Sequence, residues 1–184
     1  MTAPDELPPR PPFSPRLWPA WTGLGLALLA ARLPWLWQRA IGRGVGWLAL
    51  HLAGTRRRAA QPNIELCFPE QSPQWRARLL RDSFDALGVG LFEFARAWWG
   101  GLGPIRRGAS IEGLEHLRAL QEQGRGVLLV SGHFMTLEMC GRLLCDHVPL
   151  AGMYRRHRDP VMEWAVKRGR LRYASAMFGN GDIR

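Results

Sequence analysis

The chain has 184 residues, of which 47% are hydrophobic and 22% charged, and its formal net charge is +10. This length fits one domain, or one domain with an anchor, and the composition excludes collagen-like, disulfide-scaffold and wholly disordered chains. The net charge is +6 over residues 1–60, −1 over 61–150 and +5 over 151–184. The distribution predicts a near-neutral body that meets an anionic partner at both ends. This partner could be lipid, a phosphorylated substrate, an acidic protein or nucleic acid.

An irregular lead-in and an apolar run begin the chain. Residues 1–16 contain six prolines and are expected to lack regular structure. Residues 17–37 are mostly apolar, carry tryptophans near both ends, and would span about 31 Å as a helix, close to a bilayer core of ~30 Å. They are predicted to be a membrane anchor, spanning or monotopic. An interfacial helix or a soluble core helix also stays open, because Arg32 and Pro34 interrupt the run.

A basic juxtamembrane segment is expected at residues 38–60. Gly42 and Gly46 form a G-x-x-x-G pattern, but Arg43 lies inside it, so a flexible helix is expected and not a dimer motif. The run Arg56-Arg57-Arg58 is either a solvated charge run or a contact with lipid phosphates, and its place behind an anchor favours the second. The arginine excess after the apolar run places the rest of the chain in the cytoplasm.

Two helices are predicted in the first part of the body, which covers residues 61–184. One has Ser72 as N-cap and Pro73 at its first position, and it reaches Trp99. Its core-facing stripe is Leu80, Phe84, Leu87, Leu91, Ala95 and Trp98. A shorter helix lies within residues 111–123.

Strands and helices alternate in the second part of the body. An apolar run bounded by glycines at residues 126–132 predicts a buried strand, and residues 149–153 predict another. The helix after the first strand is expected to carry Leu137, Cys140 and Leu144 on one side. Asp159-Pro160 is predicted to cap a last helix, over residues 161–172. The expected fold is α/β, with an N-terminal membrane-anchoring helix followed by a helix-flanked, mainly parallel sheet.

The most informative pattern is His-x4-Glu after the first predicted strand. His133 follows the carboxyl end of that strand, where α/β proteins bind ligands. If Thr136 is an N-cap, Glu138 falls in the first helical turn and the loop can carry His133 back over it. A carboxylate that orients an imidazole would leave a general base able to activate a hydroxyl. A hydrogen-bonded structural histidine is the commoner role for a lone His near a helix start, and it stays open.

Other chemistry at this stretch is disfavoured. Ser131 lacks the G-x-S-x-G elbow of a serine nucleophile. The spacing of His133, Cys140, Cys145 and His147 matches no common zinc pattern, so neither a metal nor a cofactor is predicted. The odd number of cysteines, without a C-x-x-C pair, predicts reduced thiols.

Five blocks of sequence occur in an order typical of one family. They are residues 16–35, NIELCFPE at 63–70, IEGLEHL at 111–117, GHFMTLE at 132–138 and GMYRRHRDP at 152–160. In these blocks the chain resembles the lipid A biosynthesis lauroyl acyltransferase family, within the lysophospholipid acyltransferase superfamily, whose motif is His-x4-Asp or His-x4-Glu. The likeness covers almost the whole chain, and the ordered set is far more specific than the motif alone.

The resemblance implies transfer of a fatty acyl chain from acyl carrier protein to a hydroxyl of a Kdo-containing lipid A precursor, at the cytoplasmic face of the bacterial inner membrane. His133 would be the general base and Glu138 its orienter. Arg155 would stabilise a lipid phosphate or the developing oxyanion. Arg168 and Arg172 would add phosphate contacts or form a solvated face. The implied partners are acyl carrier protein, which basic surface would steer, the lipid precursor and the membrane, without nucleic acid.

The sequence departs from the family pattern in three places. Gln61-Pro62 stands where relatives usually carry basic residues, and Asp159 stands where Asn is usual. Both changes weaken the case for anion binding nearby. The chain is also shorter than family members, so residues 61–184 are expected to be a partial acyltransferase domain, truncated at the C-terminus and poorly active alone.

Three other functions stay open. One is an acyltransferase of the same superfamily with a glycerophospholipid or another glycolipid as acceptor. A second is a membrane-tethered nucleic-acid-binding module, suggested by the net charge but without an RNP or helix-turn-helix signal. The third is a non-catalytic membrane scaffold, which would keep its function when His133 is replaced.

Overall fold

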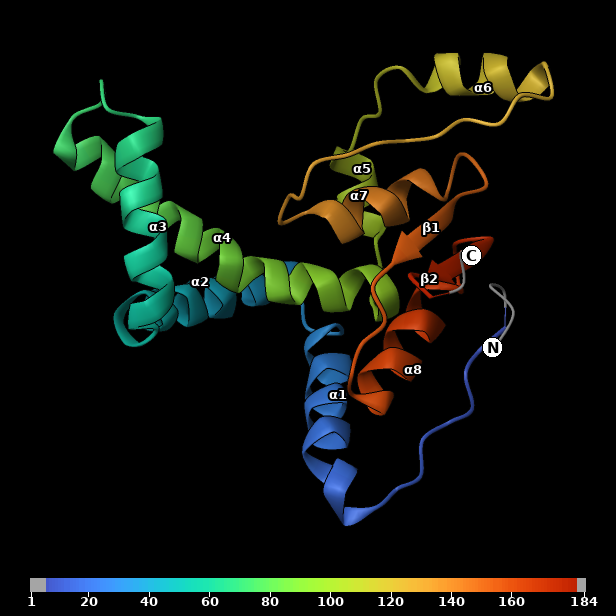
Figure 1. Cartoon of the computed structure of the whole chain (residues 1–184), viewed down its shortest axis with the longest axis horizontal. Helices are drawn as coiled ribbons and strands as arrows, with labels where there is room; N and C mark the ends of the chain where they lie inside the picture. Colours follow the sequence, from blue (N-terminus) through green and yellow to red (C-terminus); the bar gives the residue numbers. More distant parts are fainter. Residues whose placement is uncertain (1–5, 182–184) are drawn as a thin grey trace.

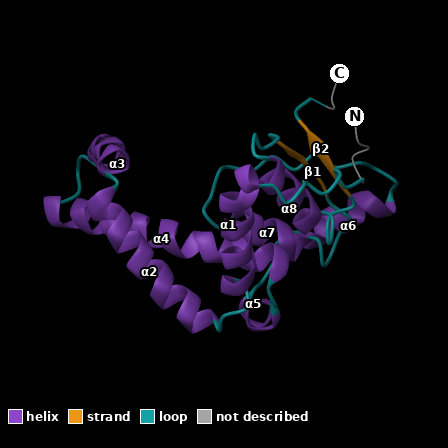
Figure 2. Cartoon of the chain, turned by 90° about the horizontal axis from the view of Figure 1, so that it is seen from below, coloured by secondary structure: helices purple, strands orange, loops and turns teal. Residues whose placement is uncertain are grey.

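The computed structural model describes residues 6–181 and is largely helical (Figure 1). After a 3₁₀ turn, the helices are α1 (Trp18–Ala30), α2 (Trp35–Leu52), α3 (Gly54–Cys67), α4 (Pro73–Trp99), α5 (Gly103–Gly108), α6 (Leu114–Glu122), α7 (Leu137–Leu144) and α8 (Pro160–Arg170). The strands are β1 (Ala151–Tyr154) and β2 (Ala176–Gly179). Helices α2 and α4 form one long arm with α3 at its end, and α1, α7, α8 and the strands gather at the other end of α4 (Figures 1 and 2).

The sheet is smaller than the sequence predicts. Strands β1 and β2 pair in parallel, with Ala151 opposite Ala176 and Tyr154 opposite Gly179, and α8 connects them. The strand predicted at residues 149–153 is therefore confirmed as β1, and the parallel strand–helix–strand unit is confirmed with it. The larger helix-flanked sheet is wrong for the described residues, whose fold is mostly helical.

The strand predicted at residues 126–132 is also wrong. The segment is a loop between α6 and α7, and the side chains of Leu128 and Val130 are each 89% exposed. Within residues 6–181 the sheet contains only β1 and β2, so no strand lies beside this segment to accept and donate its ladder hydrogen bonds. As a consequence, His133 extends from an exposed loop and not from the edge of a sheet.

The single helix predicted at residues 17–37 is divided in two. Helix α1 ends at Ala30 and α2 begins at Trp35. Pro34 disfavours helical backbone at Leu33, which ends the first helix before the proline. Among the helices within residues 6–181, none has both the length and the apolar character needed to cross a bilayer.

A buried polar network holds the break between α1 and α2 against the end of α4. The Arg96 guanidinium donates to the carbonyls of Leu33 at 2.5 Å and Gly101 at 2.6 Å. It also donates to Oε1 of Gln38 at 2.7 Å, and Nε2 of Gln38 donates to the carbonyl of Ala30 at 2.5 Å. These bonds satisfy carbonyls that helix ends leave without a partner, so the network fixes where α2 leaves α1.

Glycines bring α2 and α4 into direct backbone contact. A Cβ atom built at Gly42 would lie 2.7 Å from Cα of Val89, and one built at Gly46 would overlap the Phe84 carbonyl. A Cβ at Gly88 would in turn overlap the carbonyl of Gly42. The segment expected to be a flexible juxtamembrane helix is thus one side of an intramolecular helix pair, with small residues at the crossing.

The predicted start of α4 is confirmed, because Oγ of Ser72 accepts a hydrogen bond from the backbone N–H of Trp75 at 3.2 Å. Four members of its predicted stripe are buried, namely Leu80, Phe84, Ala95 and Trp98, whereas Leu91 is exposed. Trp98 packs in a cluster with Ala97, Leu102, Met139 and Val166. Helix α7 buries Met139, whereas of the predicted side Leu137 and Leu144 are half-buried and Cys140 is exposed.

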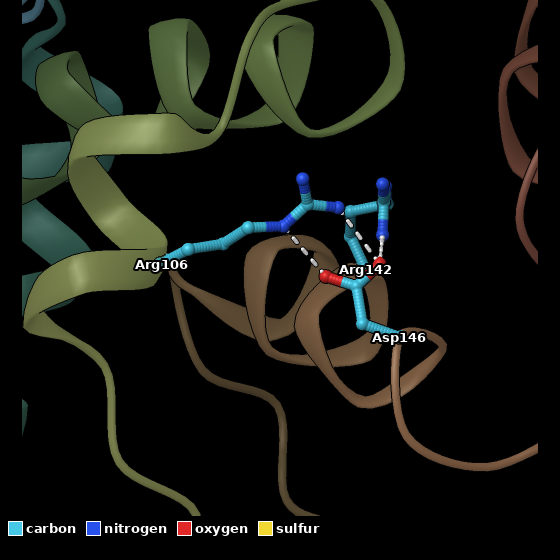
Figure 3. A network of polar contacts seen from close by, with 3 residues as sticks. All are labelled: Arg106, Arg142 and Asp146. Carbon is cyan, nitrogen blue, oxygen red and sulfur yellow. Dashed lines mark hydrogen bonds and ion pairs between the residues drawn. The ribbon is translucent and has the colours of Figure 1, made fainter.

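An arginine–aspartate–arginine network joins α5 to the end of α7 (Figure 3). Nε and Nη2 of Arg106 donate to the two carboxylate oxygens of Asp146 at 2.8 Å each. Nη1 of Arg142 donates to the same carboxylate at 2.7 Å, and its guanidinium lies over the Tyr173 ring. The hydrogen bond from Arg106 is the main reason why the pKa of the Asp146 carboxyl lies below its ordinary value of 3.8.

This network predicts a pH-dependent part of the stability. Because the folded pKa of Asp146 is depressed, its contribution is present above pH 3.8 and is lost as the pH falls through the lower folded value. We expect Asp146→Asn to lower the melting temperature at pH 6 and to reduce the further loss between pH 6 and pH 3. The exposed Glu112 supplies the control Glu112→Gln. An equal change of the pH dependence in both variants would contradict the assignment to Asp146.

Candidate active site

Glu138 lies in the first turn of α7, with Thr136 at the N-cap position, as the sequence predicts. Its Oε2 accepts hydrogen bonds from Nε1 of Trp98 at 2.7 Å and from Nε of Arg170 at 3.2 Å. Its Oε1 forms an ion pair with Nη2 of Arg170. Only 21% of the Glu138 side chain is exposed. The carboxylate is therefore held in one orientation by side chains from α4 and α8.

Arg170 is the residue of this cluster that the sequence analysis missed. Besides its ion pair with Glu138, its guanidinium lies 5.4 Å from the ring centre of Trp98 and 5.5 Å from that of Tyr154. Gly169 lets α8 approach α4 closely, since a Cβ there would lie 2.7 Å from Cβ of Trp98. Three arginines occur within five residues here, and only the packing of α8 on α4 shows that Arg170 faces the carboxylate.

A second layer fixes the chain between β1 and α8. The Tyr154 hydroxyl donates to Oε1 of Glu163 at 2.5 Å, and the backbone N–H of His157 donates to Oε2 of the same residue at 2.9 Å. At the start of α8, Oδ1 of Asp159 accepts from the backbone N–H of Val161 at 2.9 Å, which confirms the predicted helix start. These contacts hold the strand and the helix that present Tyr154 and Arg170 to the site.

The other predicted site residues lie at different distances from this cluster. His133 is exposed on the loop before α7, and the described part of the chain shows no hydrogen bond or ion pair between it and Glu138. Arg155 follows β1 and is exposed. The guanidinium of Arg168 lies 5.3 Å from the Trp164 ring, on the side of α8 that packs on α1, whereas Arg172 donates to the Trp98 carbonyl at 3.3 Å. Arg172 thus shares the partner Trp98 with Glu138, and none of the four residues is recorded in contact with the Glu138 carboxylate among the described residues.

A groove of about 470 Å³ lies between α2, α4 and the turn that precedes α7. Met135 and Thr136 line it, close in sequence to His133 and Glu138. Its ionisable lining residues are Arg39, Arg43, Asp82, Asp85 and Glu93. Burial raises the pKa of Glu93, and the nearby Arg39 partly opposes this shift. Five of the residues that line this groove are ionisable, so it suits a charged headgroup better than an acyl chain.

Comparison with known proteins identifies the class to which this arrangement belongs. A family model described as "Bacterial lipid A biosynthesis acyltransferase" matches residues 13–184. The chain is 37% identical to a lipid A biosynthesis palmitoleoyltransferase and 38% identical to a lipid A biosynthesis lauroyltransferase, both of Escherichia coli K12. Each alignment covers 92% of this chain and 56% of the relative. A lipid A biosynthesis myristoyltransferase of the same organism is 24% identical over 91% of the chain.

The chain belongs to the bacterial lipid A biosynthesis acyltransferase family. It spans about half of the length of the relatives it matches. The names of these relatives specify three different acyl groups, so the family alone does not assign an acyl chain. No solved structure matches the chain significantly.

Proposed function

We propose that this chain catalyses an acyl transfer in lipopolysaccharide synthesis, from acyl carrier protein to a hydroxyl of a Kdo-containing lipid A precursor. The reaction takes place at the cytoplasmic face of the inner membrane. The observation that supports this most is the carboxylate of Glu138, which belongs to the His-x4-Glu motif and is clamped by Trp98 and Arg170. A carboxylate held this firmly can orient a neighbouring base, which is the role that the family resemblance gives it.

In the proposed reaction His133 takes the proton of the acceptor hydroxyl as the oxygen attacks the thioester carbonyl. A C–O bond forms, the C–S bond to the carrier breaks, and the proton passes from the imidazole to the departing thiolate. A carboxylate offers about four lone-pair positions, and three of those on Glu138 are used by Trp98 and Arg170. One position on Oε1 is left for an N–H of His133, whose exposed loop can bring the ring to it when substrate binds.

The remaining arginines are proposed as anion contacts. Arg155 directly follows Tyr154 in sequence, and Arg172 donates to the Trp98 carbonyl; their charges suit a lipid phosphate or the developing oxyanion. Arg168 lies over Trp164 and would act only at the edge of a bound headgroup. The acidic carrier protein would approach this basic side of the molecule.

Arg170 is expected to act as a positioning residue through Glu138. We expect Arg170→Gln to lower kcat by roughly 10- to 100-fold with little change in KM, because the carboxylate loses its partner and its fixed orientation. Arg170→Lys should restore part of kcat, since a single ammonium can still pair with one oxygen. The matched control is Arg118→Gln, at an exposed arginine of α6, which should leave kcat unchanged. A fall of kcat that merely follows a loss of folded protein, measured by near-UV circular dichroism, would contradict the positioning role.

The activity itself is tested by incubating the purified chain with acylated carrier protein and a Kdo-containing lipid A precursor. Mass spectrometry of the lipid should show a gain of one acyl group. A lysophospholipid offered in the same reaction serves as the competing acceptor. Acylation of the lysophospholipid alone would favour a glycerophospholipid acyltransferase, and the absence of any transfer would refute the proposal for this chain.

A further inference from the structure

One half of the circumference of α2 carries exposed residues and no charged side chain. At about 100° per residue, this half runs around the helix from Leu36 to Val45, and the exposed Arg39 and Arg43 lie just outside it. We call this half the α2 arc; its large apolar members are Leu36, Trp37, Ile41, Val45, Trp47, Leu48 and Leu52. The side chains of Leu36 and Leu52 are each 74% exposed, and that of Trp37 is 65% exposed. An apolar surface of this extent on one helix marks an interaction site.

The packing of α2 on α4 determines which side of the helix forms this arc. Gly42 and Gly46 face α4, together with the buried Gln38 and Leu50. The backbone contact at the glycines leaves no freedom to turn the apolar residues inward, because any rotation would drive a side chain into α4. The arc is therefore a fixed outward face of the molecule.

The charges around α2 indicate what covers this face. Residues 35–58 contain five arginines and neither Asp nor Glu. Arg39 and Arg43 lie at one border of the arc, where long side chains can reach from apolar surface to headgroups. Arg56-Arg57-Arg58 follow on α3 and are exposed. An apolar face with two tryptophans and a purely basic border complements an anionic lipid surface.

The polar atoms of the arc do not oppose burial in lipid. The only titratable side chain on it is His51, and Nδ1 of His51 donates to the Trp47 carbonyl at 2.7 Å. The His51 ring also packs on the Trp47 ring, with 4.5 Å between centres. Tryptophan, and a histidine with one ring nitrogen already hydrogen-bonded, suit the headgroup boundary of a bilayer. There one end of the side chain meets apolar lipid and the other end meets water.

We infer that the α2 arc is a membrane-docking surface, on which α2 lies flat in the interface of an anionic phospholipid bilayer. This surface shares only Leu36 and Trp37 with the anchor predicted at residues 17–37, and it does not rest on the proposed acyl transfer. It places the ionisable groove, which Arg39 and Arg43 also line, beside the layer of lipid headgroups.

Flotation with vesicles tests this surface. The probe is a vesicle of phosphatidylcholine and phosphatidylglycerol in a ratio of about 7:3, which gives it the negative surface charge of an anionic membrane leaflet. We expect the wild-type chain to float with the vesicles. The double variant Ile41→Gln/Leu48→Gln should lower the partition coefficient at least ~10-fold, because two central apolar side chains of the arc become polar without a change of charge.

A matched control carries the same kind of change away from the arc. Leu66 on α3 and Leu128 on the loop before α7 are 78% and 89% exposed, and Leu66→Gln/Leu128→Gln should bind vesicles as the wild type does. The inference is overturned if the wild type does not float, or if the arc variant binds vesicles as well as the wild type does. It is also overturned if the control variant loses as much vesicle binding as the arc variant. A wild-type dimer that dissociates in the arc variant with unchanged flotation would identify a second copy of the chain as the occupant and overturn it as well.

Discussion

Replacing His133 with alanine is expected to lower acyl transfer by roughly 10²-fold or more, the range for loss of a general base. His133 is exposed on a loop and lies outside the buried core, so the variant should fold as the wild type does. The loss should fall on kcat, because the imidazole acts on the reacting hydroxyl and not on the lipid headgroup. The measurement is the initial rate of transfer from acyl carrier protein to the lipid A precursor.

Two comparisons separate a base from a structural histidine. His116, on α6, has 83% of its side chain exposed, and His116→Ala should leave the rate unchanged. Added imidazole should restore part of the activity of His133→Ala, since a free base can occupy the space that the side chain leaves. A His133→Ala variant as active as the wild type would remove His133 from the mechanism and leave Glu138 as a structural carboxylate.

Substituting alanine at two glycines of α2 is expected to change stability in opposite directions. A Cβ at Gly46 would lie 2.8 Å from Cα of Asp85 and overlap the Phe84 carbonyl, so the helices must separate. Overpacking of this kind typically costs about 1–3 kcal/mol. Gly44 has nothing within 4 Å of its Cβ position. Gly44→Ala should therefore stabilise the helix by about 0.5–1 kcal/mol, since alanine is the better helix former.

Denaturant unfolding followed by far-UV circular dichroism measures both changes. The two variants differ only in which side of α2 receives the methyl group, so helix propensity and hydrophobicity are matched. A loss for Gly46→Ala with a gain for Gly44→Ala supports the observed α2–α4 contact. Equal shifts in the two variants would show that α2 does not pack on α4 through its glycines, and would also remove the fixed orientation of the α2 arc.

Local signals in the sequence predict several elements well. Ser72 and Asp159 begin helices because their side-chain oxygens accept backbone N–H groups within three residues, and these contacts are present in the structure. Pro34 has a similarly local effect, and the helix break beside it follows from the restriction on the preceding residue. The position of Glu138 in a first helical turn is also local, and the ordered blocks indicated the family that the comparisons show.

The predictions that failed depend on partners far away in the chain. The apolar run at residues 126–132 has the composition of a strand, but a strand needs a neighbour to pair with, and none lies beside it in the described residues. Cys140 and Leu91 fit helical stripes, yet both are exposed. Periodicity shows that a helix has an apolar side, whereas burial also requires another element to cover it.

By itself, the sequence determined the family, the starts of α4 and α8 and the place of Glu138 at the head of α7, because these depend on residues close together in the chain. Only the tertiary structure decided that Trp98 and Arg170 hold that carboxylate, across 40 and 32 residues of sequence, and that Gly42 and Gly46 turn an apolar face of α2 outward. Those contacts depend on how closely two helices can approach each other. A local sequence pattern does not specify which helix becomes the neighbour.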